Sequence, residues 1–424
     1  MNGVLMVRKA IIILGIMVLD TIIWAIMLGI IIGAVIFSEP GAQTTSPIGQ
    51  SLIGQGSTFI YPLMTKWIEE YKHVRKNVII NYQPTGSGAG IRAIIEGTVD
   101  FACSDAPMNS EEWRTAEQKG TVLQFPVTLG GIVIIYNLPG LKGRLRLNGT
   151  VLADIYLGKI SKWNDPAIQQ LNPDLNLPDR NIIVVKRSDS SGTTYIFTDY
   201  LSSVSKEWAE KYGKTKIFAF DERIGDRGIA AQGNPGVAQA VIQNPFSIGY
   251  LELTYAEQIG INFALMQNKD GYFVDANLTT IAEAAKNAYA GLPEPDESWE
   301  NVTIVNQPGR LSYPIVSFVY MIVYKEQRGE GKLIELRNWI RWILTNGQEY
   351  ADDLYYVPLP ENVRNIGLNA ADMLTYTLKE RITNLTNYLV DLLSQKAREF
   401  GVQVSSLCLK FTSSISSMLF KTSG

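Results

Sequence analysis

The sequence is poor in the side chains that carry most metal and acid–base chemistry. Its 424 residues include one histidine and two cysteines. A structural zinc site takes four nitrogen or sulfur ligands, so this composition excludes one. The histidine, His73, lies in the charged stretch 71–76, which is typical of a solvated helix end and not of a general base inside a cleft. We expect no metal, no cofactor and no enzymatic activity.

An excess of positive charge is also missing. The chain has 38 Lys and Arg against 41 Asp and Glu, a net charge of −3. Proteins that bind nucleic acid carry a basic footprint, so we do not expect that partner. Cys103 and Cys408 are far apart in unlike surroundings, so they do not indicate a redox compartment. With 46% hydrophobic residues and 36 glycines, the chain is predicted to fold, in about two or three domains.

The amino-terminal region contains a long apolar run. Residues 10–37 carry a single charge, Asp20, and a bilayer span needs about 20 such residues. Arg8 and Lys9 precede the run, so the positive-inside rule places the amino terminus in the cytoplasm and the rest outside. The run exceeds the roughly 7–15 apolar residues of a signal peptide. A retained anchor is therefore favoured over a cleaved signal, and residues 38–49 read as a flexible linker.

Beyond the linker, the pattern is that of an α/β protein, because apolar β-branched runs alternate with helical spacing. The predicted strands include 78–82, 131–136, 182–185 and 316–323. The predicted helices include 62–71, 90–97, 193–203 and 331–346.

Three connecting loops share one chemistry. Residues 54–59, 85–90 and 187–193 each place Gly, Ser and Thr between the end of a strand and the start of a helix. Backbone N–H groups and the positive end of the helix dipole point outward there. One such loop is most simply a helix cap, since Ser, Thr and Asp are preferred at caps. Three of them, one with an arginine, favour a common anion site at a switch point of the sheet.

Taken in order, these loops and the segment 99–107 resemble the phosphate-binding component of the ABC-type phosphate importers (the Pst system). The resemblance extends over roughly residues 50 to 370, with further matching stretches at 125–131, 155–163, 243–250 and 355–360. It implies a two-lobed, periplasmic-binding-protein-like fold of type II that holds phosphate between its lobes. Lobe I would comprise 50–128 plus 314–370, and lobe II 129–313.

The resemblance also implies which residues contact phosphate. The family's ligand positions fall on Thr58, Phe59, Ser87, Asp105, Arg187, Ser191, Gly192 and Thr193. Phe59 would contribute its backbone N–H. Asp189 is placed to pair with Arg187 and orient it.

Asp105 fits an anion site only if the ligand brings a proton to donate. Phosphate keeps at least one proton near neutral pH, whereas sulfate keeps none. An unpaired buried acceptor costs about 1–3 kcal/mol, and more when it is charged. The carboxylate would therefore discriminate against sulfate.

These observations predict a monomeric phosphate receptor on the outer face of the cytoplasmic membrane, which delivers phosphate to an ABC permease. It is anchored by residues 10–37 or exported by a cleaved signal. Receptors for arsenate, sulfate or molybdate stay open as alternatives, and so does a phosphatase-like enzyme on the same fold. The tail 371–424 has apolar positions at helical spacing, which predicts a helical extension without indicating its role.

Overall fold

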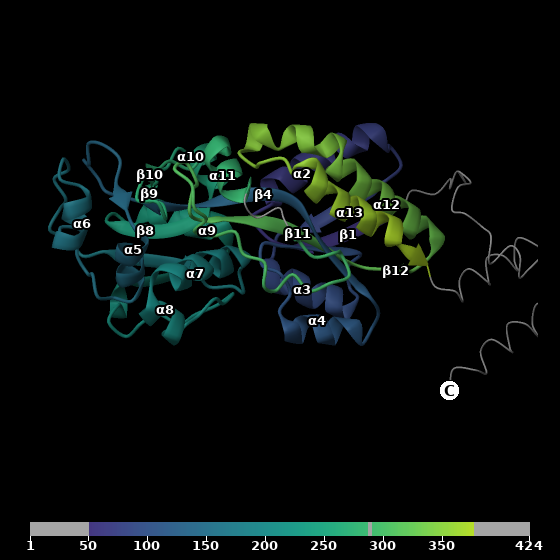
Figure 1. The fold of residues 1–424 in the computed structure, drawn as a ribbon, viewed down its shortest axis with the longest axis horizontal. Coiled ribbons are helices and arrows are strands. Elements are labelled where there is room, and N and C mark those ends of the chain that lie inside the picture. Colours follow the sequence, from purple (N-terminus) through teal and green to yellow (C-terminus); the bar gives the residue numbers. More distant parts are fainter. Residues whose placement is uncertain (1–50, 287–290, 377–424) are drawn as a thin grey trace, which may run out of the picture. The chain divides into compact units, whose positions relative to one another are not determined.

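The computed structural model describes residues 51–286 and 291–376 (Figure 1). The predicted anchor, the linker and most of the tail lie outside the described residues. In those two described ranges, every helix is too short or too polar to cross a membrane. Cys103 is buried and free, while Cys408 lies outside the described residues.

A mixed sheet of eight strands organises the described region. In spatial order its strands are β2 (Ile79–Gln83), β1 (Ser51–Gly56), β3 (Phe101–Ser104), β11 (Val316–Tyr324), β4 (Val122–Tyr136), β8 (Ser247–Glu252), β6 (Ile183–Arg187) and β7 (Gly228–Ala231). The smaller strands are β5 (Arg146–Leu147), β9 (Leu265–Gln267), β10 (Phe273–Val274), β12 (Glu326–Gln327) and β13 (Thr375–Tyr376). The mixed α/β class expected from the sequence is confirmed.

Strand direction explains where a site forms. Strands β1, β2 and β3, the first group, are parallel to one another, and β11 is antiparallel to both β3 and β4. Strands β6, β7 and β8, the second group, are also mutually parallel, and β8 is antiparallel to β4. Because β4 pairs with β11 through Gly131 and with β8 from Ile132, it passes from one group to the other. The carboxyl ends of both groups therefore face each other across the middle of the sheet.

Strand β4 is much longer than the predicted strand 131–136. A proline inside a strand argues against a central position, since it donates no ladder hydrogen bond. Here the register between β4 and β11 shifts between Val319 and Tyr320, beside Pro126. This irregularity accommodates the proline, so one strand of 15 residues runs through both groups.

Helices cover the sheet (Figure 1). They are α2 (Tyr61–Val74), α3 (Ser87–Glu96), α4 (Ser110–Glu117), α5 (Gly149–Tyr156), α6 (Pro166–Leu171), α7 (Gly192–Val204), α8 (Lys206–Lys211), α9 (Gly233–Gln243), α10 (Leu253–Ile259), α11 (Leu278–Ala285), α12 (Glu330–Leu344) and α13 (Glu361–Met373). Helix α2 shows why they pack: a proline opens it, and its buried face is Leu63, Met64, Trp67 and Tyr71, spaced by three or four residues. Helix α3 begins three residues before the predicted start at Gly90, because Gly86, at φ 96°, turns the chain into it.

Candidate functional site

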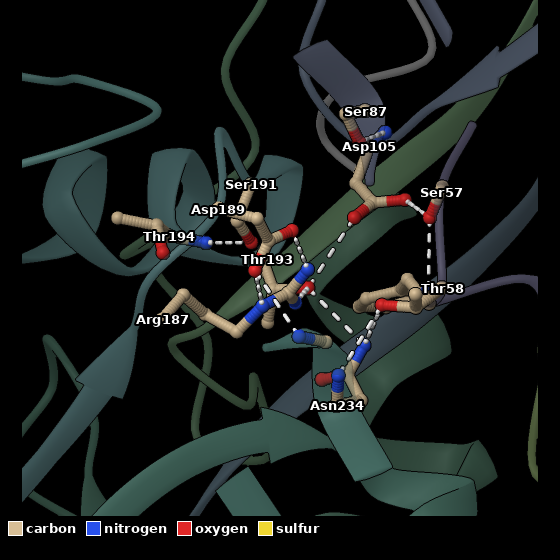
Figure 2. A network of polar contacts seen from close by, with 12 residues as sticks. Ser57, Thr58, Ser87, Asp105, Arg187, Asp189, Ser191, Thr193, Thr194 and Asn234 are labelled. Carbon is tan, nitrogen blue, oxygen red and sulfur yellow. Dashed lines mark hydrogen bonds and ion pairs between the residues drawn. The ribbon is translucent and has the colours of Figure 1, made fainter. Parts of the chain in front are cut away.

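Loops at the carboxyl ends of the two strand groups meet in one polar cluster (Figure 2). The first group contributes Thr58 after β1, Ser87 after β2 and Asp105 after β3, and all three are buried. Arg187 ends β6, and Thr193 lies in the first turn of α7. The structure thus brings together side chains that the sequence scatters over more than 130 residues.

Asp105 is the central carboxylate of the cluster. It is 2% exposed, and it accepts hydrogen bonds from the hydroxyl of Ser57 at Oδ1 and from that of Thr193 at Oδ2, the latter at 3.4 Å. Burial raises the pKa of Asp105 to about 7, against the opposing effects of the Ser57 hydrogen bond and the Arg187 charge. The group therefore changes between acceptor and donor near neutral pH.

Arg187 supplies the positive charge, and its side chain is almost fully buried. Its Nε donates to Asp189 Oδ1 at 2.8 Å and its Nη2 to Asp189 Oδ2 at 2.5 Å, a two-point contact that fixes the guanidinium plane. Its Nη1 donates to Thr193 Oγ1 at 3.1 Å. Burial alone would raise the pKa of Asp189, but the hydrogen bonds and charge of Arg187 outweigh burial and lower that pKa. Asp189 thus lies where the sequence placed it, against Arg187.

Some polar residues at the starts of the helices cap the helix, and others do not. Ser191 caps α7, because its Oγ accepts from the N–H of Thr194 at 3.1 Å. In the described chain, α2 and α3 begin without a side-chain cap, so the capping alternative does not explain their loops. A Cβ on Gly192 would lie 2.4 Å from Ser87 Oγ, so only glycine allows this close approach.

Three buried tyrosines hold the first loop. Each hydroxyl donates to the carbonyl oxygen of a successive residue: Tyr82 to Ser57 (2.9 Å), Tyr255 to Thr58 (2.6 Å) and Tyr356 to Phe59 (2.6 Å). A carbonyl oxygen facing an anion would repel it. The tyrosine hydroxyls therefore occupy these acceptors of the first loop. The N–H of Phe59 donates to Ser57 Oγ at 2.9 Å.

Two members of the cluster were not singled out from the sequence. Ser57 sits inside the first predicted loop. Asn234 follows β7, in the segment 231–236, which has the same Gly-rich, polar character as the other loops. That composition is the signal that could have identified Asn234. Within the described ranges, His, Cys, Asp and Glu side chains do not gather in groups of three or more that could hold a metal ion.

The raised pKa of Asp105 makes stability depend on pH. The unfolded carboxyl releases its proton near pH 4 and the folded one near pH 7, so the folded state holds more protons between these values. We expect the free energy of unfolding to fall as pH rises from about 4 to about 7, by about 1 kcal/mol per unit for this group. Chemical denaturation at several pH values, without oxyanions, measures it. The Asp105→Asn variant should lack this contribution to the pH dependence. If the free energy of unfolding changed equally with pH in both proteins, the raised pKa of Asp105 would be contradicted.

Comparison with known proteins identifies the family. Residues 41–346 match the family model of the PBP superfamily domain. The phosphate-binding protein PstS of Methanocaldococcus jannaschii is 40% identical over 331 residues, which are 75% of this chain and 85% of that protein. The protein of that name from Pasteurella multocida is 40% identical over 336 residues, which are 78% and 91% of the two chains.

Solved structures agree in fold. The crystal structure of a phosphate-binding protein from Stenotrophomonas maltophilia is similar with a TM-score of 0.58 at 19% sequence identity, covering 75% of this chain and 93% of that one. The family model spans well over half of the sequence, and the curated relatives align over most of their own length. This chain therefore belongs to the PBP superfamily and, within it, to the family of the PstS phosphate-binding proteins.

Proposed function

We propose that this chain binds inorganic phosphate outside the cytoplasm and delivers it to the permease of an ABC-type phosphate importer. The names of its relatives support this function. One observation carries it: the buried carboxylate of Asp105 lies among hydroxyl and guanidinium donors, while the other carboxylate of the cluster, Asp189, is paired with Arg187. Such a set, rich in donors with one acceptor, matches an oxyanion that still has a proton.

Phosphate would lie between the two strand groups. The proposed donors are Thr58, Ser87, Arg187, Ser191, Gly192, Thr193 and the N–H of Phe59, which would exchange its bond to Ser57 Oγ for one to phosphate. The first N–H groups of α7 have no partner within the helix, and its dipole favours negative charge there. Asp105 Oδ1 accepts from Ser57, and Oδ2 accepts from Thr193 at 3.4 Å. Oδ2 would accept the phosphate proton, with the Thr193 hydroxyl turning from Oδ2 to the phosphate. Nearly every ligand oxygen then has a partner, which a buried charged group requires.

The same chemistry ranks the other ligands. Sulfate and molybdate lose their protons at neutral pH and would leave Asp105 Oδ2 facing an unprotonated oxygen. Arsenate carries protons as phosphate does and stays a competitor. Catalysis is not proposed, since the relatives are named as binding proteins and His73 is exposed at the end of α2.

The organisation of the chain is part of the proposal. Two lobes, 50–128 plus 314–370 and 129–313, would close on the ligand, with β4 and β11 as the connections. Contacts between the strand groups support such closure: the N–H of Gly88 donates to Ser190 O at 2.9 Å, and Lys216 Nζ lies 2.5 Å from Glu112 Oε2. Residues 10–37 would anchor a monomer to the outer face of the cytoplasmic membrane, or be cleaved as a signal.

Calorimetric titration of the full chain in detergent tests the function. We expect tight binding of phosphate, competition by arsenate and, at pH 8, sulfate affinity lower by at least about tenfold, because Asp105 is then mostly ionised and must take up a proton before it can donate to sulfate. Equal affinity for sulfate and phosphate would contradict the role of Asp105. Absence of phosphate binding, or sustained turnover of phosphomonoesters, would contradict the function itself.

A further inference from the structure

Asn234 lies between two threonines that belong to opposite strand groups (Figure 2). Its side chain is fully buried. Its Nδ2 donates to Thr58 Oγ1 at 3.0 Å and to Thr193 Oγ1 at 3.4 Å, and its backbone N–H donates to Thr58 Oγ1 at 3.3 Å. Asn234 therefore contacts both groups through hydroxyls of the proposed phosphate site.

The orientation of the Asn234 amide is fixed by its other end. The backbone N–H of Glu252 donates to Asn234 Oδ1 at 3.2 Å. An N–H donor needs an oxygen opposite it, so the amide nitrogen must face the threonines. Both hydrogens of that nitrogen are then used as donors, one to each hydroxyl.

This arrangement determines where the hydroxyl hydrogens point. A hydroxyl oxygen has two lone pairs and one hydrogen. Thr58 Oγ1 accepts two hydrogen bonds from Asn234, so its hydrogen remains as a donor. Thr193 Oγ1 accepts from Arg187 Nη1 and from Asn234 Nδ2, and its hydrogen points toward Asp105 Oδ2. Neither hydroxyl has an acceptor lone pair left for a ligand hydrogen.

We infer that Asn234 is a positioning residue that restricts the hydroxyls of Thr58 and Thr193 to donation, that of Thr58 to the bound oxyanion and that of Thr193 to Asp105 Oδ2 or the oxyanion. The inference rests on the proposed function. A donor that is oriented before binding, as the Thr58 hydroxyl is, costs no reorientation when the ligand arrives. With both threonines restricted to donation, Asp105 is the acceptor left in this set, which strengthens selection for a protonated ligand.

A double-mutant cycle on phosphate affinity tests the inference. Asn234→Ala should weaken phosphate binding about thirtyfold in the wild-type chain, since hydrogen bonds to charged groups are worth about 1.5–3 kcal/mol. In the Thr58→Val background the same change should cost only about fivefold, because the hydroxyl on which Asn234 acts is gone. A merely structural residue would cost the same factor in both backgrounds, and that result would overturn the inference.

Asn172 provides a matched control. It is a fully buried asparagine whose side chain bonds to the backbone of Arg146 and Ile168, away from the cluster. Asn172→Ala should lower the thermal midpoint and leave phosphate affinity unchanged. If Asn234→Ala does not fold, Asn234→Ser takes its place in the cycle. Wild-type protein that fails to bind phosphate would refute the proposed function, whereas additive effects in a binding-competent protein refute only the role of Asn234.

Discussion

Replacing Arg187 with alanine is expected to weaken phosphate binding about a thousandfold. The change removes the cation of the proposed site. It also leaves the carboxylate of Asp189 without its partner, although that carboxylate is mostly buried and bonded to Arg187 at two points. A hydrogen bond to a charged group is worth about 1.5–3 kcal/mol, and the uncompensated charge of Asp189 would in addition repel the anion. Calorimetric titration with phosphate measures the loss.

Arg144 offers a control, since it too is bonded to an aspartate at two points. It pairs with Asp275 through two hydrogen bonds of 2.6 and 2.7 Å, on a half-exposed surface. Arg144→Ala should leave phosphate affinity within about twofold of wild type, since surface pairs contribute little. Arg187→Lys keeps the positive charge but loses the planar guanidinium. Its phosphate affinity should lie between those of wild type and Arg187→Ala. An Arg187→Ala protein that binds phosphate normally would contradict the proposed site.

Much of the site was predictable because strong strand patterns precede its loops. The runs before the loops at 54–59, 85–90 and 187–193 are apolar and each loop contains glycine, so strand ends and helix starts could be located. Family resemblance then selected residues within them. The structure shows that the two groups of parallel strands face each other and so bring these loops together. No local sequence pattern predicts that arrangement.

Asn234 escaped prediction for a physical reason. Strand β7, before it, has the sequence Gly-Ile-Ala-Ala and is only partly buried, so it lacks the apolar run that marks a buried strand. The length of β4 was not predicted for another reason: a proline such as Pro126 argues against a continuous central strand. In both cases tertiary pairing overrides a weak or contrary local signal.

The roles of the tyrosines were not predictable at all. The sequence contains 20 of them, and their pattern favours core positions. Tyr255 and Tyr356 are indeed buried, yet each reaches a carbonyl of the first loop nearly 200 or nearly 300 residues away in the chain. Contacts of such separation depend on the whole fold.

Asp105→Asn is expected to abolish most of the preference for phosphate over sulfate. Asparagine has nearly the same shape, but its amide brings hydrogens that a sulfate oxygen accepts, in place of a carboxylate that repels it. At pH 8 only about a tenth of wild-type Asp105 is neutral, so sulfate affinity should rise about tenfold in the variant, whose amide donates without taking up a proton. Phosphate affinity should fall, because its proton loses a charged acceptor. Titrations of both proteins with both anions give the ratio.

The pH dependence of sulfate binding tests the same carboxyl without changing its site. Because the pKa of Asp105 is about 7, the neutral form that donates to sulfate makes up about a tenth of the protein at pH 8 and about nine tenths at pH 6. Wild-type affinity for sulfate should therefore rise about tenfold from pH 8 to pH 6, and that of Asp105→Asn should stay level. Asp199, whose pKa burial also raises, bonds to Thr303 outside the cluster, so Asp199→Asn should keep the wild-type profile. A wild-type sulfate affinity that does not change with pH would mean that another group sets the selectivity.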